Sequence, residues 1–167
     1  NLYFLRSQRL PEPAGAAAVQ NPASARGRRG GGRGRRGPRG PAQIIKVDLT
    51  KLFADSEVGE LKDASEYEKV CGTIPVEMGA GGDMALDPTE EFAYFRVSSE
   101  VAAQHLPNDV KPAEPFGPRG MGAGPTGLAS MNLKTGEVKF IVAVSFQIGH
   151  VQTNPWMPGE IVFCWET

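Results

Sequence analysis

The sequence matches itself at an offset of 67 residues. Gly82–Pro88 (GDMALDP) aligns with Gly149–Pro155 (GHVQTNP), and each copy is followed by an apolar run, Phe92–Phe95 in the first and Ile161–Cys164 in the second. Each copy predicts a strand, a turn with Asp or Asn before Pro, and a second strand, because these residues favour turns between apolar runs. Such a repeat is typical of β-propellers, whose blades are four-stranded antiparallel meanders. Chance similarity of two short β segments is the competing interpretation.

The offset is longer than the roughly 40 to 50 residues of common blade repeats. Residues 104–127 lie between the two copies and are dense in Pro and Gly. A segment of this composition is typical of a surface insertion. Without about 20 residues of insertion, the period falls within the usual range.

The rest of the pattern is all-β. Apolar runs separated by turn residues occur at 67–75, 84–86, 92–97, 128–133, 138–146, 151–153 and 161–165. Gly136 supplies the positive φ of a tight hairpin, so the runs on either side of it should pair. The sequence therefore predicts a partial β-propeller, with about two four-stranded antiparallel blades over residues 69–167. Because a propeller needs at least about four blades, we expect a fragment whose missing blades lie downstream.

Charge divides the chain near residue 42. Residues 1–42 hold nine Lys and Arg and one acid, whereas residues 43–167 hold nine bases and 18 acids. The tract 25–40 (ARGRRGGGRGRRGPRG) has almost nothing apolar to bury, so we predict a disordered Arg/Gly-rich tail over 1–42. Residues 1–4 resemble part of a cleavage tag and are excluded from fold reasoning. Residues 43–68 should form a strand edge and then an acidic linker or short helix.

Composition also limits location and partners. No apolar run is long enough to span a membrane, and no secretory signal is predicted. Cys71 and Cys164 have no metal-ligand spacing, so we expect free thiols in a cytoplasmic protein. Arg/Gly tracts can follow RNA phosphates. This tract lacks interleaved aromatic residues, so nucleic acid is not the expected partner.

The segment Leu128–Thr167 resembles the corresponding blade of the oligogalacturonate lyases, β-propeller polysaccharide lyases that finish pectin breakdown. The residues that carry the resemblance are Met131–Glu137, Ile148–His150, Pro155, Phe163, Cys164 and Glu166. The upstream run Gly82–Tyr94 fits an earlier blade less specifically. The resemblance implies a ring of seven blades and an N-terminal fragment of such an enzyme.

The resemblance further implies cleavage of short oligogalacturonides by β-elimination. A base removes the proton next to the uronate carboxylate, and the glycosidic oxygen leaves. The carboxylate charge must be neutralised first, and an imidazole suits the base. The resemblance points to His150 as this base, and to a divalent metal, manganese, held by side chains beyond Thr167. We therefore expect this chain alone to bind no catalytic metal and to be inactive.

Three further residues are candidate substrate contacts. Gln152 could touch sugar hydroxyls, Trp156 could stack on a sugar ring, and Arg119 is the Arg nearest to the Gly-His segment. Packing is the alternative role for Trp156, and a solvated loop charge is the alternative for Arg119. Asn154 could also touch sugar hydroxyls, but turn stabilisation is its expected role. His150 could equally bond to a neighbouring blade, although Asp83 at the equivalent position indicates that the scaffold does not require His there.

Two other functions remain open. A non-enzymatic β-propeller serving as an interaction scaffold would share every strand and turn predicted above. A cupin metal-binding domain would use His150, Gln152 and Glu160 in a pattern similar to His-x-His…Glu. The cupin pattern is incomplete, because Gln replaces the second His and the spacer to Glu160 is too long.

Overall fold

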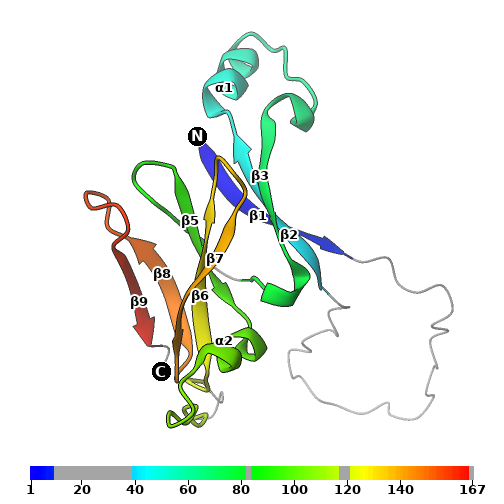
Figure 1. The fold of residues 1–167 in the computed structure, drawn as a ribbon. Helices are drawn as coiled ribbons and strands as arrows, with labels where there is room; N and C mark the ends of the chain where they lie inside the picture. Colours follow the sequence, from blue (N-terminus) through cyan, green and yellow to red (C-terminus); the bar gives the residue numbers. More distant parts are fainter. Residues whose placement is uncertain (10–38, 82–83, 117–120, 166–167) are drawn as a thin grey trace, which may run out of the picture.

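The structure, a computed structural model of the chain, describes residues 1–9, 39–81, 84–116 and 121–165 (Figure 1). The central Arg/Gly tract, Asp83, Arg119 and Glu166 lie outside these residues. The predictions made for them therefore stay predictions.

Within the described residues the strands form three antiparallel sheets. The first sheet contains β1 (Leu2–Arg9), β2 (Arg39–Val47) and β3 (Glu68–Ile74) in that order. The second is a meander of β4 (Met84–Leu86), β5 (Phe92–Val97), β6 (Thr126–Asn132) and β7 (Val138–Val144). The third is a hairpin of β8 (Ile148–Thr153) and β9 (Ile161–Trp165). The all-β, antiparallel prediction is thus confirmed.

Helices occupy the connections. They are α1 (Leu49–Glu57), α2 (Ser99–His105) and the short 3₁₀ turns η1 (Ala64–Glu66) and η2 (Val76–Met78). Asp48 and Ser98 cap the two α-helices, each accepting a bond from a backbone N–H of the first turn, which a free helix end leaves unpaired. α2 lies against β6 and β7, and in the described part of the chain no helix has the length and apolarity needed to cross a membrane.

The three sheets lie one after another across the molecule (Figure 1). A buried layer lies between each pair of neighbouring sheets. The layer between the first and second sheets contains Ala42, Ile44, Ile74, Ala80, Ala93, Phe95, Val97, Ala102, Ala129, Met131 and Leu133. The layer between the second and third contains Ala85, Tyr94, Leu128, Ile148 and Val151. Alternate residues of β5 enter opposite layers, as the two-residue period of a strand requires. The second sheet is therefore covered on both faces.

The first sheet corrects the expected boundaries. Residues 2–9 and 39–42 lie in strands, in contrast to the predicted disordered tail over 1–42. β2 pairs with both β1 and β3, so it is a central strand and not a sheet edge. The physical reason is that Tyr3 and Leu5 pack against the buried layer between the first and second sheets. Residues 69–74 of β3 also belong to this sheet and not to a blade that starts at 69.

The predicted hairpin between 128–133 and 138–144 is confirmed. β6 and β7 pair in antiparallel register, and Gly136 has a φ of 75°. Asn132 Oδ1 accepts the backbone N–H groups of Lys134 and Thr135, which fixes the turn before that glycine. The left-handed backbone at Gly136 is one that side chains other than Gly rarely adopt.

The two halves of the sequence repeat form equivalent turns. In the β4–β5 turn, the Asp87 N–H donates to the Phe92 carbonyl at 2.8 Å, and Asp87 Oδ1 accepts the Thr89 N–H at 2.8 Å. In the β8–β9 turn, the Asn154 N–H donates to the Glu160 carbonyl, and Asn154 Oδ1 accepts the Trp156 N–H, both at 2.9 Å. The residue before Pro therefore closes both turns in the same way.

The first strands of these hairpins also run in the same direction. At one end, Thr153 Oγ1 at the end of β8 donates to the carbonyl of Leu86 at the end of β4. At the other end, Arg96 Nη1 donates to the carbonyl of Ile148 at the start of β8. Arg96 follows Phe95, which pairs with Met84 at the start of β4. β4 and β8 are therefore neighbouring, parallel first strands of successive sheets.

Candidate functional site

His150 lies in a β-bulge. The register pairs Ile148 with Trp165 and Val151 with Phe163, so three steps on β8 face two steps on β9. The His150 N–H donates to Cys164 Sγ at 3.3 Å. A bulge adds one residue and re-aims the side chains around it. As a result Ile148 and Val151 are both buried, and His150 between them is exposed.

The face that carries His150 differs from its counterpart in the first hairpin. There, Ala85 and Tyr94 lie in the layer that faces the third sheet. By strand register, Gln152 and Val162 take their places in the second hairpin, and both are exposed. A covered, apolar face has thus become an open face with an imidazole and an amide. Burial of polar groups costs free energy unless they are hydrogen-bonded, so this imidazole and this amide suit an open face.

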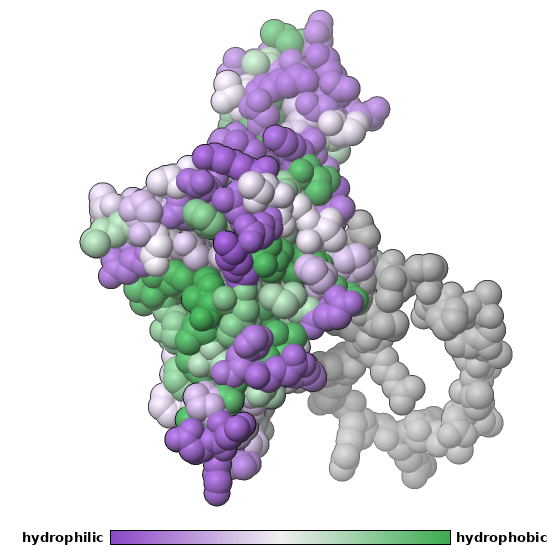
Figure 2. Space-filling view, viewed as in Figure 1, coloured by the Kyte–Doolittle hydropathy of each residue, from purple (hydrophilic) through white to green (hydrophobic). Residues whose placement is uncertain are grey.

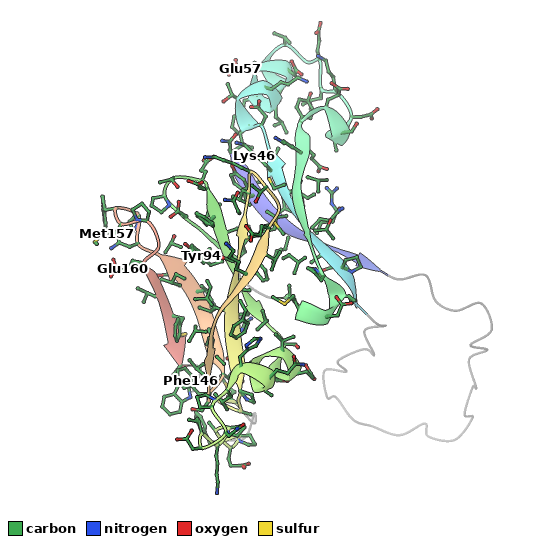
Figure 3. All side chains as sticks on the ribbon, viewed as in Figure 1. Lys46, Glu57, Tyr94, Phe146, Met157 and Glu160 are labelled. Atoms are coloured by element: carbon green, nitrogen blue, oxygen red, sulfur yellow. The ribbon has the colours of Figure 1, made fainter. Side chains whose placement is uncertain are left out.

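Two of the four predicted site residues share this face. His150 and Gln152 are both exposed on β8. Trp156 lies in the β8–β9 turn and is 85% exposed, so it does not serve packing in the described part of the chain. The same turn places Met157 and Glu160 at the outer end of the hairpin (Figure 3). Arg119 lies outside the described residues.

The turn that presents Trp156 is internally fixed. The Asn154 side-chain amide donates to Glu160 Oε2, and the Glu160 N–H donates to the Met157 carbonyl. The Glu160 carboxylate therefore accepts a hydrogen bond within the turn. The cupin pattern of His150, Gln152 and Glu160 gains no support from this arrangement.

The opposite end of the third sheet is aromatic. The Phe146 ring stacks on Trp165 with centroids 4.8 Å apart, and tilts against Phe163 at 6.4 Å. Figure 3 shows Phe146 at the end of the hairpin away from Met157. Figure 2 shows apolar side chains gathered over the middle of this side of the molecule. The polar site on β8 thus belongs to a sheet that is largely apolar elsewhere.

Arg96 is a residue that the sequence reasoning missed. Its guanidinium reaches from β5 to the Ile148 carbonyl at 2.8 Å, two residues before His150. Strand alternation could have found it, because Arg96 shares its face with Phe92 and Tyr94 and so must point toward the third sheet. Beside it, burial and then the charge of Asp87 raise the pKa of Tyr94, which favours the protonated phenol.

The other chemically active groups do not assemble into a centre. Among the described residues no group of three or more His, Cys, Asp or Glu could hold a metal ion. His105, the second histidine, stacks on Phe140 with ring centroids 3.8 Å apart. Cys71 and Cys164 are both free thiols, and burial raises the pKa of Cys71.

Comparisons with known proteins give no assignment. No family model, no curated protein and no solved structure matches the chain. The function must therefore be argued from the residues themselves.

Proposed function

We propose that the three sheets are successive blades of an incomplete β-propeller. The proposal is supported by face-to-face packing in chain order and by the parallel neighbours β4 and β8. The second sheet supplies a full four-stranded meander. β7 then leads directly to β8, as the last strand of a blade leads to the first strand of the next.

The first sheet fits the same scheme. The Tyr3 hydroxyl and the Asn1 amide, at the start of β1, both donate to Glu90 Oε2 in the turn after β4, each at 2.8 Å. β1 therefore begins where β4 ends, and the two strands run in opposite directions. An antiparallel neighbour of the innermost strand corresponds to the second strand of a blade, so β1–β3 would supply strands two to four.

We further propose that the ring to which these blades belong is an oligogalacturonate lyase, with His150 as the base. The observation that carries this proposal is the bulge at Gly149–His150 on the first strand of a blade. Bulges are over-represented next to active sites, where they re-aim one side chain. The equivalent strand β4 pairs with β5 without a register shift, so the bulge is not a requirement of the repeat.

The proposed reaction needs one proton transfer from carbon. His150 accepts the proton next to the uronate carboxylate, the electron pair forms a carbon–carbon double bond, and the glycosidic oxygen leaves and takes a proton from water. Gln152, exposed on the same face, is placed to hydrogen-bond a sugar hydroxyl. Imidazole side chains serve as general bases around neutral pH.

The metal that the resemblance implies finds no site in the described residues, because no cluster of three ligands exists there. Such an ion would neutralise the uronate carboxylate. Any ligands would have to come from other strands of the ring.

The test is turnover of trigalacturonate by the intact gene product, followed by the ultraviolet absorbance of the unsaturated uronate. His150→Ala should lower kcat by about 100-fold or more. His105→Ala is the matched control, since His105 is the last residue of α2 and stacks on Phe140, so its loss should leave turnover nearly unchanged. Folded wild-type protein that yields no unsaturated product, or a His150→Ala variant with unchanged kcat, would refute the proposal.

A second candidate is an interaction scaffold, favoured by the segment 48–67 between β2 and β3. This acidic excursion projects from the sheets and carries α1, in which no residue is buried (Figure 1). Phe53, Val58 and Leu61 are each more than half exposed. The excursion holds six acids and two lysines, and Figure 2 shows its mainly hydrophilic surface. A cationic partner with apolar side chains fits such a surface.

The excursion is also ordered by its own contacts. Tyr67 is buried, its hydroxyl donates to Asp55 at 3.0 Å and accepts the Lys62 N–H at 2.8 Å. Lys51 Nζ donates to the Glu66 carbonyl at 3.0 Å. A surface formed in advance loses less conformational entropy on binding.

The scaffold predicts binding without turnover. A fluorescent amphipathic peptide of Lys and Leu should bind the chain, and replacing Phe53, Val58 and Leu61 by Ser should weaken binding about 10-fold or more. Val76→Ser, which changes an exposed valine in η2, is the control. Equal peptide affinities for the triple variant and the control would exclude this surface.

A further inference from the structure

Both backbone groups of Ile148 are held by side chains of the second sheet. The Ile148 N–H donates to Thr126 Oγ1 at 2.8 Å, and the Thr126 hydroxyl donates to the Phe146 carbonyl at 2.8 Å. The Ile148 carbonyl accepts from Arg96 Nη1, also at 2.8 Å. The Ile148 side chain is fully buried. The start of β8 is therefore fixed to β5 and β6 and not only to β9.

This anchor matters because the ladder between β8 and β9 shifts register around His150. Pairing between β8 and β9 is interrupted from Ile148 to Val151, and the His150 N–H meets a thiol instead of a carbonyl. A bulge disrupts the ladder locally, so the residues that flank it help to set its conformation. Val151 is buried at one end, and Ile148 is clamped at the other.

If the role of Arg96 were purely structural, it would lower the stability of the fold. Its Nε is buried and has no hydrogen-bond partner among the described residues. A buried donor without a partner destabilises a fold, and an apolar residue of similar shape would avoid that cost. The place that corresponds to Arg96 in the next hairpin is Cys164 by strand register. The hairpin does not require Arg at this place.

We propose that Arg96 and Thr126 form a positioning pair that sets the orientation of the His150 imidazole. They act through the backbone of Ile148 and the bulge that follows it. Arg96 is thereby a positioning residue and not a catalytic residue, because the guanidinium bonds to the backbone and not to the reacting atoms. The catalytic meaning of this pair rests on the lyase activity proposed above.

The experiment has two readouts. NMR of the chain follows the ring signals of His150, and turnover of trigalacturonate by the intact gene product gives kcat and KM. Arg96→Met and Thr126→Val should each shift the His150 signals. Each should also lower kcat by about 10- to 100-fold with a smaller change in KM, as expected from a misplaced base. Arg6→Met is the matched control, because Arg6 pairs with Glu68 in the first sheet.

The readouts separate the two proposals. His150 signals that stay at their wild-type positions in both variants would overturn the positioning pair, whatever happens to turnover. If the His150 signals shift in the variants but the folded wild-type protein has no lyase activity, the positioning pair is supported and the lyase proposal is refuted. If Arg96→Met does not fold, Thr126→Val decides the question, since valine keeps the shape of threonine and loses both hydrogen bonds.

Discussion

The β4–β5 and β8–β9 hairpins share a turn and differ in what covers them. Asp87 and Asn154 close the two turns with equivalent bonds, one from the backbone N–H and one to the side-chain oxygen. Yet the first hairpin lies inside a sheet that is covered on both faces, whereas the second exposes His150 and Gln152 on one face. Turn geometry is thus a local property. The role of each strand face depends on which sheet lies beside it.

The residues at the tips of the two turns also differ in what they contact. Glu90 in the first turn accepts bonds from Tyr3 and Asn1 and lies 3.7 Å from Lys46 Nζ, so it links the first and second sheets. Its counterpart at the 67-residue offset is Met157, which is exposed beside Trp156. One turn joins neighbouring sheets, and the other presents apolar side chains to solvent.

The largest expected difference in stability between the two hairpins concerns their core phenylalanines. Phe95 is fully buried between two sheets, so Phe95→Ala should lower the free energy of unfolding by about 3–5 kcal/mol. Phe163, its counterpart by register, is half-buried, and Phe163→Ala should cost less than about 3 kcal/mol. Urea denaturation measures both. Equal costs would mean that the second hairpin is covered as fully as the first.

The turn residues should differ less. Asp87 is only 2% exposed, and its Oδ1 accepts bonds from both the N–H and the hydroxyl of Thr89. Asp87→Ala should therefore cost about 1–3 kcal/mol, because it leaves donors in a partly buried turn unpaired. Asn154→Ala should cost about 0.5–1.5 kcal/mol, since water can replace the lost bonds. A larger loss in Asn154→Ala, measured by the same urea transitions, would reverse this order.

Acid should weaken the first turn, because it contains the Glu90 carboxylate. The Tyr3 hydroxyl, then the Asn1 amide and the Lys46 charge, lower the pKa of Glu90 in the folded chain. The stabilisation is therefore complete above the unfolded pKa of about 4.5 and is lost as pH falls through the folded value. For a partly exposed group it should amount to less than about 1 kcal/mol.

The measurement compares urea midpoints at neutral pH and near pH 3. Glu90→Gln should reduce the loss of stability on acidification, whereas Met157→Gln at the equivalent turn should leave it unchanged. Identical pH profiles for wild type and Glu90→Gln would show that the carboxylate does not link the two sheets.

The smallest effect is expected at the tip of the second turn. The Trp156 backbone N–H donates to Asn154 Oδ1, and the residue is 85% exposed, so Trp156→Ala should change the free energy of unfolding by less than about 0.5 kcal/mol. Trp165→Ala, which removes the stack on Phe146, should cost more. A substantial loss in Trp156→Ala would place this side chain in a packed environment and remove it as a sugar platform.

The amino-acid sequence alone determined the local features of the fold, which are its strands and turns. Strands 84–86, 92–97 and 161–165 were predicted with the bounds that the structure gives, and Gly136 has the expected positive φ. The 67-residue match identified two equivalent hairpins. These features depend on residues close together in the chain, through side-chain alternation and turn preferences.

Tertiary structure decided the rest. Residues 2–9 form β1 because Tyr3 and Leu5 pack against a core to which distant strands contribute. The exposure of His150 depends on a bulge set by pairing with β9, and Arg96 acquires its role only because β8 lies beside β5. Contacts between residues 50 or more positions apart are not encoded in local patterns, since each depends on how whole sheets pack.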